Sequence, residues 1–301
     1  MDTALGANCV EQASGRRASK VEHSEGRLFL PHAAGEKYAF GQEASVKARL
    51  AVLLSRVPSP IAKRFTTDSW LTKIARPLIE AFAPSEPSEI AIRSGEGKGL
   101  KLFIDLRHEK YYLTGTWELP VQEALTAELS PSAPFWDVGA HCGFFTVIAA
   151  SRGARVHAFE PMPENRHRLE RAIAANALER VTVHPYAIGL ASGQAILRAS
   201  DSTSEWSLLG EGEGVTVGVR TLDEMLDVLG PPHVVKIDVE GAEVDVLRGA
   251  KRLLTDPAPT LLVEFTSPRH VDEARELVPD YSFSALSDNQ WLLRRKPHPS
   301  G

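Results

Sequence analysis

Cysteine is almost absent from this chain of 301 residues, which contains only Cys9 and Cys142. Two cysteines are too few for a disulfide framework or a cysteine-rich metal site, and we expect no bound metal. The same scarcity is typical of proteins from reducing compartments, so we expect a cytoplasmic location.

An excess of positive charge and long apolar runs are also missing. The formal net charge is -5, whereas nucleic-acid-binding surfaces are basic, so we expect no nucleic-acid partner. No segment approaches the roughly 18–20 consecutive apolar residues of a membrane span, and residues 1–27 lack the apolar region of a secretory signal. We therefore expect no integral membrane contact.

Composition divides the chain into three expected parts. Residues 1–43 are polar, glycine-rich and without periodicity, which predicts disorder. Residues 44–88 contain two helical patterns, at 44–57 and 70–82, followed by a linker rich in proline and serine. We expect this helical extension to pack on the main domain at 89–297, although it could instead cover a cleft, bind a partner or lie on a membrane surface.

In the main domain, strand-like and helix-like stretches alternate. Strands are expected at 133–138, 154–159, 180–186, 233–238 and 259–265, with helices near 118–129, 143–152, 163–178, 221–229, 242–255 and 269–278. This alternation predicts an α/β fold with a doubly wound, mostly parallel sheet. Runs at 89–93 and 99–106 predict a hairpin, and those at 281–285 and 290–293 predict an antiparallel C-terminal hairpin.

The first parallel strand leads into a glycine loop. Asp137 ends the strand, and Gly139 and Gly143 bracket the turn before the next helix. Gly139 allows the backbone to turn, and Gly143 allows the helix and a ligand to approach closely. The G-x-x-x-G spacing differs from the G-x-G-x-x-G of dinucleotide-binding proteins, and such a loop can also be only a turn.

The second strand ends in an acidic residue, Glu160, which follows Gly139 by 21 residues. In a β-α-β unit this carboxylate lies within reach of a ribose diol and can accept hydrogen bonds from both hydroxyls. A surface glutamate before a proline-initiated helix is the alternative, and the order of the two features favours the ribose contact.

The fourth parallel strand and its loop carry Lys236, Asp238, Glu240 and Glu243. The two glutamates could simply favour the start of the following helix, and Asp238 could cap it. A lysine within a strand needs a partner, because a buried ammonium is costly without one.

Three segments together resemble the FkbM family of S-adenosylmethionine-dependent methyltransferases: Asp-Val-Gly-Ala-x-x-Gly at 137–143, Phe-Glu-Pro at 159–161, and Lys-Ile-Asp-Val-Glu-Gly-Ala-Glu at 236–243. Gly115-Thr-Trp-Glu118 is similar to a further motif of the family. The resemblance covers about 112–296 and implies a Rossmann-like class I methyltransferase fold.

The resemblance also implies roles for individual residues. S-adenosylmethionine would lie across the carboxyl ends of the first two strands, with Glu160 on its ribose and Ala187 beside the adenine. The other expected cofactor-binding residues are Asp137, Gly139, Ala140, His141, Gly143 and Glu118. The family usually has Asn-Ile where this chain has His141-Cys142, which changes a side-chain contact. We expect Cys142 to pack as a small apolar residue.

The reaction implied is methylation of a hydroxyl on a small molecule, such as a sugar, a polyketide or another secondary metabolite. Asp238 and Glu240 are the first candidates for the general base, and His141 and Asp201 are reserves. Lys236 is predicted to be a catalytic residue together with Asp238 and Glu240. Two alternatives stay open: a non-catalytic methyltransferase-like binding module, and a nicotinamide-dependent oxidoreductase on a similar sheet. The glycine spacing argues against the oxidoreductase, and the intact set of Asp137, Gly139, Glu160 and Asp238 argues against the binding module.

Overall fold

The computed structural model describes residues 86–199, 206–207 and 214–297. The predicted disorder at 1–43, the two helices of the N-terminal extension and the reserve base Asp201 lie outside these residues. The structure therefore bears on the main domain alone.

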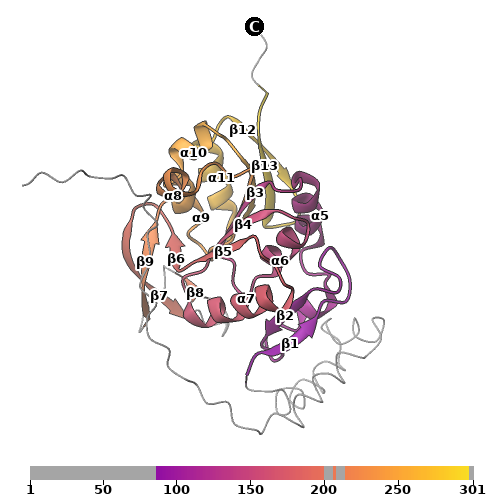
Figure 1. Cartoon of the computed structure of the whole chain (residues 1–301). Coiled ribbons are helices and arrows are strands. Elements are labelled where there is room, and N and C mark those ends of the chain that lie inside the picture. The colour runs from indigo at the N-terminus through magenta and orange to yellow at the C-terminus, as the bar shows by residue number, and fades with distance from the viewer. Residues whose placement is uncertain (1–85, 200–205, 208–213, 298–301) are drawn as a thin grey trace, which may run out of the picture. The chain divides into compact units, whose positions relative to one another are not determined.

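A seven-stranded sheet forms the centre of the described domain (Figure 1). Its order is β12 (Tyr281–Ala285), β13 (Gln290–Arg295), β11 (Thr260–Glu264), β10 (Val234–Ile237), β3 (Pro134–Val138), β4 (Arg155–Phe159) and β5 (Val181–His184). The five strands from β11 to β5 run parallel, whereas β13 is antiparallel to both of its neighbours. The predicted mostly parallel sheet and C-terminal hairpin are confirmed.

Helices cover both faces of this sheet, because its strands carry apolar side chains on both sides. The successive residues Phe135 and Trp136 are both fully buried but belong to different cores. The first core packs against α5 (Leu119–Glu128), α6 (Phe144–Ser151) and α7 (Pro163–Ala175). The second packs against α8 (Leu222–Leu229), α9 (Glu243–Arg248), α10 (Lys251–Thr255) and α11 (Pro268–Leu277). Because helices lie on both faces, the sheet is doubly wound, as predicted.

Smaller elements lie outside the seven-stranded sheet. The predicted strand at 180–186 is divided, because β5 stays in the main sheet while β6 (Tyr186–Ile188) joins a second sheet with β9 (Val215–Arg220), β7 (Gly193–Ala199) and β8 (Trp206–Ser207). The expected N-terminal hairpin is present as β1 (Ser88–Ala91) and β2 (Lys101–Ile104), followed by the short helix α4 (Tyr111–Thr114).

The helix predicted at 242–255 is interrupted after the 6 residues of α9. Gly249 separates α9 from α10, and Ala250 adopts a non-helical backbone conformation. A Cβ on Gly249 would lie 2.2 Å from the carbonyl oxygen of Gly189. The interruption thus coincides with a close approach to the chain leaving β6, which the apolar periodicity of the segment does not reveal. In the described ranges, no helix combines the length and apolar character needed to cross a bilayer.

Candidate active site

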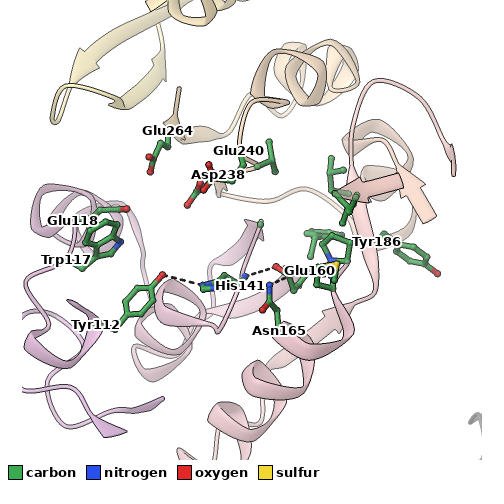
Figure 2. A pocket seen from close by; sticks show the side chains of 18 of the residues that line it. Tyr112, Trp117, Glu118, His141, Glu160, Asn165, Tyr186, Asp238, Glu240 and Glu264 are labelled. Atoms are coloured by element: carbon green, nitrogen blue, oxygen red, sulfur yellow. Dashed lines mark hydrogen bonds between the residues drawn. The ribbon is translucent and has the colours of Figure 1, made fainter. Parts of the chain in front are cut away.

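A cavity of about 310 Å³ opens at the carboxyl edge of the parallel strands (Figure 2). Ligands of doubly wound sheets bind at this edge, and small-molecule sites begin at about this volume. One part of the wall is largely apolar and includes Phe159, Met162, Ala187, Ile188 and Leu197. Figure 2 shows the opposite part lined by acidic and aromatic side chains.

The ends of three strands meet tightly below this cavity. Gly139 has φ of 82°, and a Cβ on it would lie 1.7 Å from the carbonyl oxygen of Asp238 at the end of β10. The backbone N–H groups of Gly139 and Ala140 both donate to the carbonyl oxygen of Phe159, at 3.0 and 3.1 Å. Glycine at 139 therefore brings the ends of β3, β4 and β10 together.

The loop then enters α6 at Gly143. This residue has φ of 91°, and a Cβ on it would lie 2.4 Å from Cδ1 of Leu169 in α7. Cys142 beside it is fully buried in the first core, as expected for a small apolar residue.

Glu160 is fixed on the cavity wall by the same loop. Its Oε2 accepts from the backbone N–H of His141 at 2.8 Å, and its Oε1 accepts from the backbone N–H of Met162 at 2.9 Å and from Asn165 Nδ2 at 3.3 Å. The residue is 5% exposed. A carboxylate has about four acceptor positions, and three are used here, so one position on Oε2 is left for a ligand hydroxyl.

A buried ion pair that none of the sequence motifs predicts supports the loop from behind. Glu109 is 1% exposed, and its Oε2 accepts from Arg168 at 2.6 Å. Its Oε1 lies 3.1 Å from His141 Nε2, which also lies 3.1 Å from an Arg168 nitrogen. Arg168 donates further to Asn165 Oδ1 at 2.6 Å, which links the pair to the side chain that holds Glu160.

These contacts shift the pKa values of Glu109 and His141. Burial acts to raise the pKa of Glu109, but hydrogen bonds and charge from His141 and Arg168 lower it to about 2. Burial acts to lower the pKa of His141, but Cys142 and Glu109 raise it to about 10. The side chain of His141 therefore braces the loop, while its backbone N–H holds Glu160.

The position of Arg168 in its helix is the sequence feature that predicts a buried partner for this arginine. Asn165, Arg168, Leu169 and Ala172 are all buried, and their i, i+3, i+4, i+7 spacing places the arginine on the inward face of α7. Glu109 has no comparable local signature.

Lys236 has the partner that its position in a strand requires. The side chain is buried, with Nζ 2.8 Å from Asp238 Oδ2 and 4.8 Å from the centre of the Phe145 ring. Burial acts to lower the pKa of Lys236, and the charges of Asp238, Asp137 and Glu118 raise it above its usual value.

Two further carboxylates approach this ion pair from other elements (Figure 2). Burial, together with the charges of Asp238 and Glu264, raises the pKa of Glu118 to about 8 despite the opposing charge of Lys236. Burial and the charge of Asp238 raise the pKa of Glu264 to about 7. Glu118, Lys236 and Glu264 also line one small hollow behind the cavity, so the three side chains form a contiguous group.

Three residues of the cavity wall adopt the left-handed backbone region although they are not glycine. They are Glu118, His141 and Glu240, with φ of 48°, 51° and 51°. Such conformations cost of order 1–3 kcal/mol and cluster at functional sites. This concentration supports assigning function to the cavity.

The sequence-predicted residues separate into two groups. Those that line the cavity are Glu118, Gly139, His141, Glu160, Ala187, Asp238 and Glu240. Those that do not are Asp137, Ala140, Gly143 and Lys236. Glu264, Trp117, Tyr111 and Tyr112 line it as well and were not among the predicted site residues.

Residues 137–285 match the family described as the methyltransferase FkbM domain. The chain carries an FkbM methyltransferase domain. The predicted family and the predicted class I methyltransferase fold are confirmed.

Individual proteins resemble this FkbM chain over part of their length. The hexuronic acid methyltransferase AglP of Haloferax volcanii is 32% identical over 146 residues, which cover 46% of this chain and 58% of AglP. Methyltransferase 1 of Beauveria bassiana is 28% identical over 176 residues, covering 50% of this chain and 68% of that protein. The match to the antimetabolite synthetase AmbE of Pseudomonas aeruginosa, 30% identical over 164 residues, covers 40% of this chain and 8% of that protein.

Solved structures also resemble the FkbM chain. An FkbM methyltransferase from Methylobacillus flagellatus aligns with a TM-score of 0.41 at 20% identity, covering 61% of this chain and 46% of that one. A 16S rRNA methyltransferase of Thermus thermophilus, RsmC, aligns with a TM-score of 0.44 at 16% identity, covering 71% and 52%.

The side chains that line the FkbM cavity are distributed in a way that suits S-adenosylmethionine. Glu160 offers a fixed carboxylate beside an apolar wall that suits an adenosine. Behind the loop, Asp137 is 1% exposed, and Oδ2 accepts from Thr146 Oγ1 at 2.6 Å while Oδ1 has no hydrogen-bond partner within the described residues. Burial raises the pKa of Asp137. Its unsatisfied oxygen favours a bridging water or ligand donor at this end of the loop.

Proposed function

We propose that this chain transfers the methyl group of S-adenosylmethionine to a hydroxyl group of a small molecule. One observation carries the proposal: a single cavity joins the fixed carboxylate of Glu160 to the acidic group at Glu118, Asp238 and Glu264. The first part suits the ribose of the cofactor, and the second suits an acceptor that must lose a proton. The name of AglP, a hexuronic acid methyltransferase, supports a sugar or a related polyol as the acceptor.

The chemistry that the cofactor supplies is an electrophilic methyl group on a sulfonium, and its sulfide leaves without protonation. The residues of the chain then have two tasks, to align the acceptor oxygen and to take its proton. Asp238 and Glu240 remain candidates for the proton acceptor, but one oxygen of Asp238 is occupied by Lys236. We add Glu264, whose pKa of about 7 is better matched to proton transfer near neutral pH.

We assign Lys236 a positioning role in this proposal. Its ammonium lies behind the wall of the cavity and fixes the orientation of Asp238. We also propose that the enzyme works on small molecules in the cytoplasm, without a nucleic-acid or integral membrane partner. The scarcity of cysteine and the net charge of -5 support this assignment.

The test uses the purified full-length chain in two steps. Calorimetry with S-adenosylmethionine should show binding at one site per chain, and NADH should not compete. Incubation with a panel of polyol glycosides should then yield S-adenosylhomocysteine together with a methyl ether. Failure of a folded sample to bind the cofactor would overturn the proposal. Binding without turnover on any acceptor would favour the non-catalytic binding module.

A further inference from the structure

We infer that the acceptor is an uncharged or amine-bearing sugar-like polyol, and that sugars carrying a carboxylate near the reacting hydroxyl are excluded. This inference rests on the proposed methyl transfer and names its substrate class. The inferred class of acceptor differs from the hexuronic acid in the name of AglP.

The ionisable side chains of the cavity wall are predominantly acidic. Among the lining residues that the structure describes are five acids, Glu118, Glu160, Asp238, Glu240 and Glu264, and no lysine or arginine. A carboxylate on the substrate is usually recognised by an arginine or a lysine that faces it. The described part of this wall offers neither.

The two buried cations behind the wall are paired with carboxylates, and Arg166 beside it donates to the backbone carbonyl oxygens of Glu160 and Pro161. The Lys236 ammonium, 5% exposed, lies 2.8 Å from Asp238, and Arg168, 10% exposed, lies 2.6 Å from Glu109. His141, which does line the cavity, lies 3.1 Å from the same Glu109. An anionic acceptor would therefore meet acidic side chains, and the described lining offers it no lysine or arginine to pair with.

The protonation of the group gives independent support. The pKa values of Glu118 and Glu264, about 8 and about 7, show that burial and mutual repulsion already make it costly to ionise all of these carboxylates at neutral pH. Another anion would increase this cost. A neutral polyol donates its hydroxyl groups to carboxylate oxygens, and an ammonium compensates their charge.

The aromatic wall suits the same class of acceptor. Trp117 is 37% exposed and lines the cavity, and its ring centroid lies 4.1 Å from that of Tyr111. An exposed indole offers an apolar surface to the C–H face of a sugar ring and attracts a cation to its π face. Carboxylates and an indole around one cavity thus select for hydroxyl and ammonium groups.

The experiment compares three glycosides that share one aglycone: a glucoside, a 2-amino-2-deoxyglucoside and a glucuronide. Full-length protein is supplied with radiolabelled S-adenosylmethionine, and kcat/KM for methyl transfer is measured for each glycoside. Equilibrium dialysis of each against protein saturated with S-adenosylhomocysteine gives the affinities directly. We expect kcat/KM and affinity at least about tenfold higher for the neutral or amino glycoside than for the glucuronide, a ratio that corresponds to one unpaired charge in a partly buried site.

Charge variants test the cause of the discrimination. Glu264→Gln and Glu118→Lys should each reduce the ratio of the affinity for the neutral glycoside to the affinity for the glucuronide. A change in the rate of methyl transfer does not affect this comparison, because both glycosides depend on the same proton acceptor. Glu179→Gln is the matched control, since this exposed glutamate precedes β5 at the opposite edge of the sheet and should leave the ratio unchanged.

Two results would overturn the inference. One is a glucuronide that is bound or methylated as well as the neutral glycoside. The other is the absence of binding of all three glycosides to protein that still binds S-adenosylmethionine, which would leave the proposed methyl transfer standing while removing the sugar class.

Discussion

Gly139 lies so close to Asp238 that a Cβ at position 139 would come within 1.7 Å of the Asp238 carbonyl oxygen. Gly139→Ala should therefore lower the free energy of unfolding by at least about 2 kcal/mol, since the left-handed backbone and the backbone clash both disfavour a side chain. Urea denaturation measures the change. Gly193→Ala is the control, because no heavy atom of the described residues, apart from its own chain neighbours, lies within 4 Å of a Cβ there. Equal stability of the two variants would show that the two strand ends are not in contact.

Removing the charge of Glu160 should weaken the binding of S-adenosylmethionine. Glu160→Gln removes the charge and places an amide NH2 opposite one of the two backbone N–H donors, so we expect the Kd to rise about 10- to 100-fold, corresponding to the loss of a charge-assisted hydrogen bond. Calorimetry measures this effect, with thermal melts to show that the variant is folded. Glu164→Gln, on the exposed first turn of α7, should bind as the wild type does. An unchanged Kd in Glu160→Gln would remove this residue from the cofactor site.

The buried pair of Glu109 and Arg168 should contribute strongly to stability. Glu109→Gln leaves the guanidinium uncompensated and should cost about 3–5 kcal/mol at pH 7. The pKa of Glu109 is lowered from 4.5 to about 2, so its contribution is present above about pH 4.5 and is lost as the pH falls toward 2. Urea titrations over this range should show the difference between variant and wild type shrinking.

The control for this pair is an exposed ion pair of the same chemistry. Glu89 lies 3.1 Å from Lys101 with both side chains nearly half exposed, and Glu89→Gln should cost less than about 1 kcal/mol. A similar cost for the two variants would contradict the buried pair's role.

The raised pKa values of Glu118 and Glu264 predict the opposite pH dependence of stability. The folded chain binds more protons than the unfolded chain between 4.5 and about 8, so stability should fall as the pH rises through this window. Glu118→Gln should flatten the fall and raise the Tm by several degrees at about pH 9. Thermal melts across this range measure the slope. A Glu118→Gln chain that loses stability as steeply as the wild type would show that Glu118 is not the group responsible.

Methyl transfer should accelerate as Glu264 loses its proton. If this carboxylate takes the proton of the acceptor, kcat/KM should rise with pH and level off above about 7. Glu264→Gln should lower the rate by about 10²–10⁴-fold and abolish this limb of the profile. An unaltered pH profile in the variant would return the role to Asp238 or Glu240.

The sequence was sufficient for the parts of the site that follow from topology. Glu160 and Asp238 each directly follow a parallel strand, and parallel strands end at one edge, so their convergence needed only the alternation of elements. Gly139 was identifiable as a turn residue. Its contact with Asp238 depends on how close two strand ends come, which no local pattern encodes.

Other features escaped because their causes are long-range. Glu109 and Arg168 pair across 59 positions of the chain, and the segment holding Glu109 has neither a strand nor a helix period. The break at Gly249 reflects the close approach of Gly189, while the apolar spacing around it continues as in one helix. The acidic character of the acceptor end arises from three separate elements, and each of them looks ordinary when taken alone.

The exposed indole of Trp117 gives the protein an optical reporter of its own. Trp136 is fully buried, whereas a compound resting on Trp117 changes the polarity around that exposed ring and shields it from acrylamide. Differences between wild-type and Trp117→Phe spectra would isolate this signal. Unlabelled compound libraries can then be screened by fluorescence before any methylated product is known.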